Sequence, residues 1–321
     1  MDNNLINMNN DIIDDAPKVL SGGTEEDYLF ADIKKGSLLE DEAANHLNYF
    51  TCRNCKTTFV TKMSTNTCVF CNSNDVMKIS GQTNNLYYIP FSKTVDDAIN
   101  DYKKKIRFRF LLPSVFTSKE SIKSIKKVYL PFLLRDCNTN GKVIFYAADQ
   151  NKVNKQIETK KYEVCYDVNF DFKNLSVSRS SKIENNAVLS YEYNSLTLFD
   201  NNVFNDSCGI IDDLDENAVI NNMNNQINNS VISMVRDGIT HQLKKLKNNG
   251  VVLNNVVDKR VLLPVFLNVI NYKNTDYIYI MNGQTGESNL MYKISPIKLV
   301  IVSIITILII FFIVFLVASI I

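Results

Sequence analysis

The 321-residue chain carries 35 basic and 34 acidic side chains, and its formal net charge of +1 neither favours nor excludes a polyanionic partner. Its length allows two or three modest domains, and its 7 cysteines, an odd number, argue against a fully paired disulfide scaffold. The expected compartment is therefore a reducing one, the cytosol.

The N-terminal segment 1–45 is expected to be largely disordered. It holds eleven acidic and three basic residues, is rich in Asn and Asp, and has few aromatic side chains. A segment of this composition buries too little apolar surface to offset the entropy lost on ordering.

Two paired-cysteine motifs lie within residues 46–80, which we predict to be a zinc ribbon. Cys52-Arg-Asn-Cys55 and Cys68-Val-Phe-Cys71 are separated by twelve residues, which suit a short β-hairpin between two knuckles. Four thiolates close a tetrahedral site and leave no open position, so we predict one structural Zn²⁺ bound by Cys52, Cys55, Cys68 and Cys71. The alternatives are a pair of disulfides or a redox dithiol. His46 is interpreted as a surface histidine rather than a further ligand.

Residues 88–135 are expected to form a helical linker region that ends in a strand. A first helix is predicted to begin near Ser92 or Thr94. Apolar side chains then recur at helical spacing, at Val95, Ala98, Ile99, Tyr102 and Ile106. Thr117-Ser-Lys-Glu120 is typical of a capping box before a second, short helix, and Val128–Leu134 has the composition of a strand.

Residues 136–292 are expected to form a β-rich body with a helical insertion near 201–247. The best predicted strands are Val143–Ala148, Tyr162–Phe172 and Arg260–Met281, the last broken by a turn at Lys273–Asp276.

The segment 299–321 is predicted to be a transmembrane helix. It has no charged residue, and at about 1.5 Å per residue it reaches roughly 34 Å, enough for a hydrocarbon core of about 30 Å. A buried core helix is the alternative. Lys293 and Lys298 precede the segment and no basic residue follows it, so the body is expected to be cytoplasmic. The N-terminus lacks the features of a signal peptide. Together these patterns predict an α+β fold: a small zinc ribbon, a mixed helical and β-rich body, and one C-terminal transmembrane helix.

Six short motifs occur in order between residues 47 and 298. They are Tyr49-Phe50-x-Cys52-x-x-Cys55, Ile89-Pro90-Phe91-x-Lys93, Leu112-Pro113-x-x-Phe116, Val128-Tyr-Leu-Pro-Phe132, Leu263-Pro264-Val265 and Asn282-Gly-Gln-Thr-Gly286. In this series the chain resembles the zinc-ribbon membrane proteins of low-GC Gram-positive bacteria. That family is often labelled transcription-factor-IIB-type zinc-ribbon-containing or, misleadingly, primosomal helicase-like. Members often carry an additional earlier ribbon, which is missing here because 1–45 holds no cysteine. The resemblance implies a ribbon, a mixed body and a membrane tail, but no activity.

No catalytic motif is found in the sequence. Gly141-Lys142 is followed by Val143 rather than by the Ser or Thr of a phosphate-binding loop, and only two histidines are present. We therefore predict that the protein is not an enzyme and has no small-molecule substrate.

A basic stretch leaves three interpretations open. From Tyr102 to Lys127 there are nine basic residues and one acidic residue, with Phe108 and Phe110 among them. The stretch is a solvated helix face, a surface for anionic lipid headgroups, or a nucleic-acid contact, and the membrane tether favours lipid over nucleic acid. The sequence thus predicts a membrane-anchored binding or scaffold module, whose partners are the lipid bilayer and an unidentified protein. The alternative is a membrane-tethered nucleic-acid-binding regulator.

Overall fold

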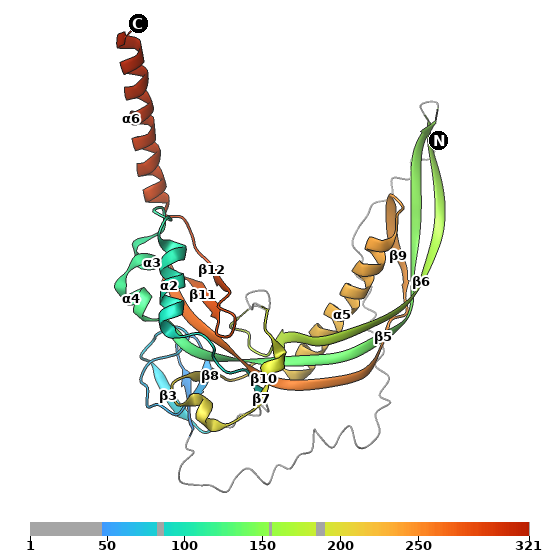
Figure 1. Cartoon of the computed structure of the whole chain (residues 1–321), viewed down its shortest axis with the longest axis horizontal. Helices are drawn as coiled ribbons and strands as arrows, with labels where there is room; N and C mark the ends of the chain where they lie inside the picture. The colour runs from blue at the N-terminus through green and yellow to red at the C-terminus, as the bar shows by residue number, and fades with distance from the viewer. Residues whose placement is uncertain (1–46, 82–86, 154–155, 184–189, 321) are drawn as a thin grey trace. The chain divides into compact units, whose positions relative to one another are not determined.

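The computed structural model describes residues 47–81, 87–153, 156–183 and 190–320 (Figure 1). The segment 1–45, expected to be disordered, and His46 lie outside the described residues. The described chain combines helices with a 12-stranded sheet, whose main path runs β12-β11-β10-β5-β8-β2-β1-β3. Helix and strand are therefore mixed, as predicted, and the body is rich in strand.

The strands are β1 (Asn48–Cys52), β2 (Thr58–Thr61), β3 (Val76–Ile79), β4 (Tyr87–Tyr88), β5 (Lys126–Val153), β6 (Gln156–Ser178), β7 (Thr197–Leu198), β8 (Cys208–Ile210), β9 (Leu243–Asn249), β10 (Val252–Tyr272), β11 (Thr275–Asn282) and β12 (Ser288–Leu290). The helices are α2 (Val95–Ile106), α3 (Ser114–Thr117), α4 (Lys119–Lys123), α5 (Glu216–Gly238) and α6 (Pro296–Ile320), with 3₁₀ turns at Tyr193–Ser195 and Asn201–Phe204.

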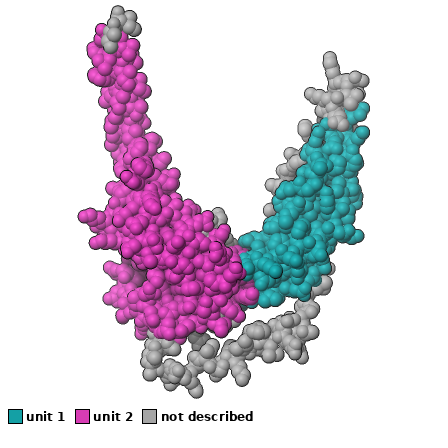
Figure 2. All heavy atoms as spheres, viewed as in Figure 1, with its two compact units in different colours: residues 1–33, 135–175, 216–258 teal, residues 34–134, 176–215, 259–321 magenta. Residues whose placement is uncertain are grey.

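The chain folds into two compact units (Figure 2). Among the described residues, unit 1 comprises 135–175 and 216–258, and unit 2 comprises 47–134, 176–215 and 259–320. The expected body 136–292 is therefore shared between the two units. The physical reason lies in β5, β6 and β10, which are 28, 23 and 21 residues long and each have residues in both units.

Unit 1 packs α5 against β-strands. Val219, Met223, Ile227, Val231 and Val235 recur at every fourth position of α5 and are buried. The C-terminal half of the helix shares a hydrophobic core with Val143, Phe145 and Ala147 of β5. The insertion expected near 201–247 thus contains one helix of 23 residues, with β8 before it and β9 after it.

Unit 2 holds the cysteine motifs, α2 to α4 and α6. Helix α2 begins where its cap predicts. The Thr94 hydroxyl accepts from the Asp97 backbone N–H at 3.2 Å, and the Asp97 carboxylate accepts from the Thr94 backbone N–H at 2.9 Å. Its buried face, with Ala98 and Tyr102, packs against β10 and β11 through Phe266 and Tyr279.

Candidate metal centre

Each paired-cysteine motif forms a tight turn. Cys52 ends β1, and its carbonyl accepts from the backbone N–H of Lys56 at 2.9 Å. Lys56 has a φ of 61°, and Asn72, the residue after Cys71, has a φ of 59°. Each of these residues directly follows the second cysteine of its motif and has the left-handed backbone conformation.

The four predicted ligands converge. The Sγ atoms of Cys52, Cys55, Cys68 and Cys71 all lie within 4.8 Å of one another. Cys52 Sγ is 3.7 Å from Cys71 Sγ, and Cys55 Sγ is 3.6 Å from Cys68 Sγ. Four sulfurs about 2.3 Å from a central zinc in tetrahedral geometry are roughly 3.8 Å apart. The cluster therefore has the donor set and the spacing of a site that could hold a metal ion.

The four cysteines are not paired in disulfides, and the interior of the cluster is shielded from solvent. Cys52 and Cys68 are buried, whereas Cys55 and Cys71 are half-buried. The contact between the Cys55 and Cys68 thiols lowers the pKa of Cys55 to about 4 and raises the pKa of Cys68. Burial raises the pKa of Cys71. Without a cation, neighbouring thiolates in one buried site disfavour each other, and a divalent metal removes that penalty.

Nearby groups orient the sulfurs. The backbone N–H of Phe70 donates to Cys68 Sγ at 3.4 Å, and Asn54 Nδ2 donates to Cys71 Sγ at 3.6 Å. Such hydrogen bonds favour thiolate over thiol and hold the ligands in place.

Two lysines that are distant in sequence reach the cysteine turns. Lys126 Nζ donates to the Cys68 carbonyl at 2.8 Å and to the Asn72 side chain at 2.5 Å, and Lys182 Nζ donates to the Cys55 carbonyl at 2.7 Å. Burial lowers the pKa of Lys126. A Zn²⁺ ion with four thiolates would carry a net charge of −2. The two nearby ammonium groups would lower the electrostatic free energy of burying that charge. In the sequence Lys126 belongs to the basic stretch and lies more than fifty residues from the cysteine turn that it contacts.

The cysteine motifs are built into unit 2. Strand β1 pairs antiparallel with β2 and β3, and β2 pairs in turn with β8 through Phe59 opposite Ile210. One hydrophobic core includes ribbon side chains such as Phe50, Phe59 and Phe70 together with side chains of β5, β8 and β10. The ribbon and the remainder of unit 2 thus share a core.

Helix α6 is long and apolar enough to cross a membrane. Its candidate span, Pro296–Ser319, has 24 residues, none of which is buried. The hydroxyls of Ser303, Thr306 and Ser319 each donate to the carbonyl four residues earlier, at 2.8 to 2.9 Å, so they present no unsatisfied polar group to lipid. The predicted span was 299–321; the helix begins earlier because Pro296 fits its first turn and the Ser295 carbonyl accepts from Leu299 N–H at 3.0 Å.

The basic stretch is not one continuous surface. Lys126 contacts the cysteine turn, and Lys127 pairs with Asp206 at 2.5 Å. Lys103, Lys104 and Arg107 remain exposed at the end of α2.

No family model and no solved structure match the chain. Among curated proteins, the chain is similar to the Uncharacterized protein YdjG of Bacillus subtilis (strain 168), with 25% identity over 221 residues. The match covers 65% of this chain and 64% of that protein, so the chain spans less than two thirds of its relative's length.

Proposed function

We propose that the protein is a non-enzymatic, single-pass membrane protein whose zinc-ribbon body lies in the cytoplasm and acts as a binding or scaffold module. One observation carries the proposal: the four-cysteine cluster and the apolar helix α6 belong to the same compact unit. A partner bound to unit 2 would therefore be held at the membrane.

Zinc is the proposed metal, and its role is structural. Four sulfur donors suit Zn²⁺, and they leave no coordination position for water or substrate. We also propose membership of the zinc-ribbon membrane proteins of low-GC Gram-positive bacteria, on the basis of the six ordered motifs and the four-cysteine cluster.

The proposed orientation follows from charge. Lys293 and Lys298 lie just before the apolar part of α6, and basic residues beside a membrane span favour the cytoplasmic side. Exposed Cys165 in unit 1 provides a test. A membrane-impermeant maleimide should label wild-type protein only after the cells are permeabilised, and Cys165→Ser should lose part of that signal. Labelling of Cys165 in intact cells would refute the orientation.

The anchor and the metal are tested separately. Deleting 299–321 should move the protein from the membrane fraction to the soluble fraction. Pelleting of the truncated chain with membranes after a high-salt wash would contradict the anchor. Elemental analysis of protein purified without chelator should find one zinc per chain, and Cys68→Ser should lose it, whereas Cys165→Ser should keep it. Absence of zinc from the wild-type protein would refute the metal assignment.

The partner class is tested by affinity purification from detergent-solubilised membranes, with and without nuclease. A scaffold should retain its protein partners after nuclease treatment. Loss of every partner on nuclease treatment would instead support the membrane-tethered nucleic-acid-binding regulator.

A further inference from the structure

The segment that follows α2 is fastened to the beginning of α6. The Leu111 carbonyl accepts from the backbone N–H of Ser295 at 2.9 Å, and Lys298 Nζ donates to the Leu112 carbonyl at 2.6 Å. The Arg109 guanidinium lies 4.1 Å from the centre of the Tyr292 ring. These contacts hold residues 109–112 beside the start of the apolar helix.

Two aromatic rings in this segment face solvent. Phe108 is 79% exposed and Phe110 is 69% exposed, although neighbouring Leu112 is buried. Tyr292 and Ile294, which precede α6, are also exposed. Exposing such large apolar rings to water is unfavourable. Aromatic side chains beside a membrane helix characteristically occupy the interface between lipid headgroups and acyl chains.

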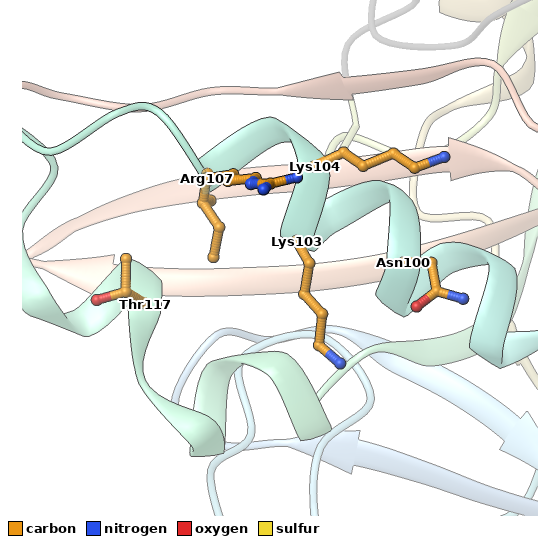
Figure 3. A pocket seen from close by; sticks show the side chains of 6 residues that line it. Asn100, Lys103, Lys104, Arg107 and Thr117 are labelled. Atoms are coloured by element: carbon orange, nitrogen blue, oxygen red, sulfur yellow. The ribbon is translucent and has the colours of Figure 1, made fainter.

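A cationic pocket lies at the same end of α2. Its volume is about 560 Å³, and it is lined by Asn100, Lys103, Lys104, Ile106, Arg107 and Thr117. Figure 3 shows Lys103 and Lys104 on the last turn of α2 and Arg107 directly after it, with Thr117 at the end of α3. The lining contains no carboxylate. The C-terminal end of a helix contributes roughly half a negative charge, so three cations leave the pocket net positive.

We propose that this pocket binds the phosphate headgroup of an anionic phospholipid, while Phe108 and Phe110 insert into the adjoining interface. The inference rests on the proposed function, in which α6 crosses the bilayer. Three features select lipid as the occupant: positive charge without a carboxylate, exposed aromatic rings two and four residues beyond Ile106, and hydrogen bonds that fix this segment to the first turn of α6.

Insertion of the aromatic rings can be measured directly because the chain contains no tryptophan. Phe108→Trp and Phe110→Trp each give a single probe in full-length protein reconstituted in phosphatidylcholine–phosphatidylglycerol nanodiscs. Both should emit at shorter wavelength than Leu198→Trp, a control at a side chain that is 71% exposed in β7. Both should also be quenched by lipids brominated near the headgroup. Emission and quenching equal to those of the control would overturn the inference.

The charge contribution is measured on full-length protein in uncharged detergent with dioctanoylphosphatidylglycerol as ligand. Neutralising Lys103, Lys104 and Arg107 to Gln should weaken binding about fivefold per charge, and so roughly a hundredfold in all. The matched control neutralises Lys160, Lys161 and Lys173, three exposed lysines of β6, and should bind like wild type. Dioctanoylphosphatidylcholine should bind all three proteins weakly.

Two further ligands distinguish the sources of phosphate. Glycerol phosphate, which lacks acyl chains, should bind much more weakly than the lipid. The triple replacement should not change the binding of a single-stranded oligonucleotide. If the wild type binds the oligonucleotide but not the lipid, and the triple replacement abolishes oligonucleotide binding, the pocket is a nucleic-acid contact and the inference is wrong. If wild type and the triple replacement bind the lipid equally while the protein remains zinc-loaded and membrane-bound, only the headgroup inference fails. A truncated chain that stays in the membrane would instead refute the proposed function.

Discussion

Loss of the proposed zinc ion is expected to destabilise unit 2 well beyond the ribbon. Cys52→Ser removes one of the four sulfurs and should release the metal, and such small units depend on zinc for folding. The ribbon contributes Phe50, Phe59 and Phe70 to the core that it shares with β5, β8 and β10, and these rings are 7%, 0% and 6% exposed. At about 1.5–3 kcal/mol for each buried side chain, the three rings account for roughly 5–9 kcal/mol. That is comparable with the stability of a whole domain, about 5–15 kcal/mol.

Hydrogen exchange read by mass spectrometry can locate this effect. In Cys52→Ser, amides of Val128–Leu134 should exchange faster than in wild type, because these residues belong to the core shared with the ribbon. Amides of Val143–Ala147, in the same strand β5, should keep their protection because Val143, Phe145 and Ala147 belong to the separate core of unit 1. Cys165→Ser is the matched control, since Cys165 is exposed, belongs to unit 1 and is not one of the four clustered cysteines. Wild-type exchange of Val128–Leu134 in a zinc-free Cys52→Ser protein would refute the coupling.

Three further changes test other parts of the structure. Arg135→Met should lower the free energy of unfolding of unit 1 by about 3 kcal/mol, because Arg135 is buried and donates to both Asp258 oxygens at 2.6 and 2.7 Å; a loss under about 1 kcal/mol in urea titration would contradict this. Gly283→Ala should cost about 1–3 kcal/mol, because a Cβ there would lie 2.5 Å from Phe91 Cδ1; an unchanged melting temperature would show that the ring moves freely aside. Burial raises the pKa of Tyr279, whereas an unfolded tyrosine ionises near about pH 10. The buried Tyr279 hydroxyl therefore contributes stability below about pH 10, and this contribution is lost as the pH rises above that value. Tyr279→Phe should reduce the fall in melting temperature between about pH 9 and 11. An equal fall in the wild type and the variant would refute the assignment.

Features that depend only on residues close together in the chain could be predicted from the sequence. Spacing within Cys52–Cys71 identified four thiols that meet in the structure, because the turns that present them are made by adjacent residues. The apolar run after Lys298 identified the helix of 24 residues that could cross a membrane, because length and composition alone decide that property. Helix α2 followed from its apolar period for the same reason.

Only the tertiary structure decided how these parts join. The residues around Phe59 do not indicate that it pairs with Ile210. The residues around Lys126 do not indicate that its ammonium group donates to the Cys68 carbonyl. The sequence also did not predict the division into two units. The strands β5, β6 and β10 are each more than 20 residues long and have residues in both units, whereas their sequence pattern indicates a single β-rich body. The contacts that join Leu111 and Leu112 to the start of α6 link segments more than 180 residues apart. Sequence fixes what each side chain can do, and long-range packing determines which side chains act together.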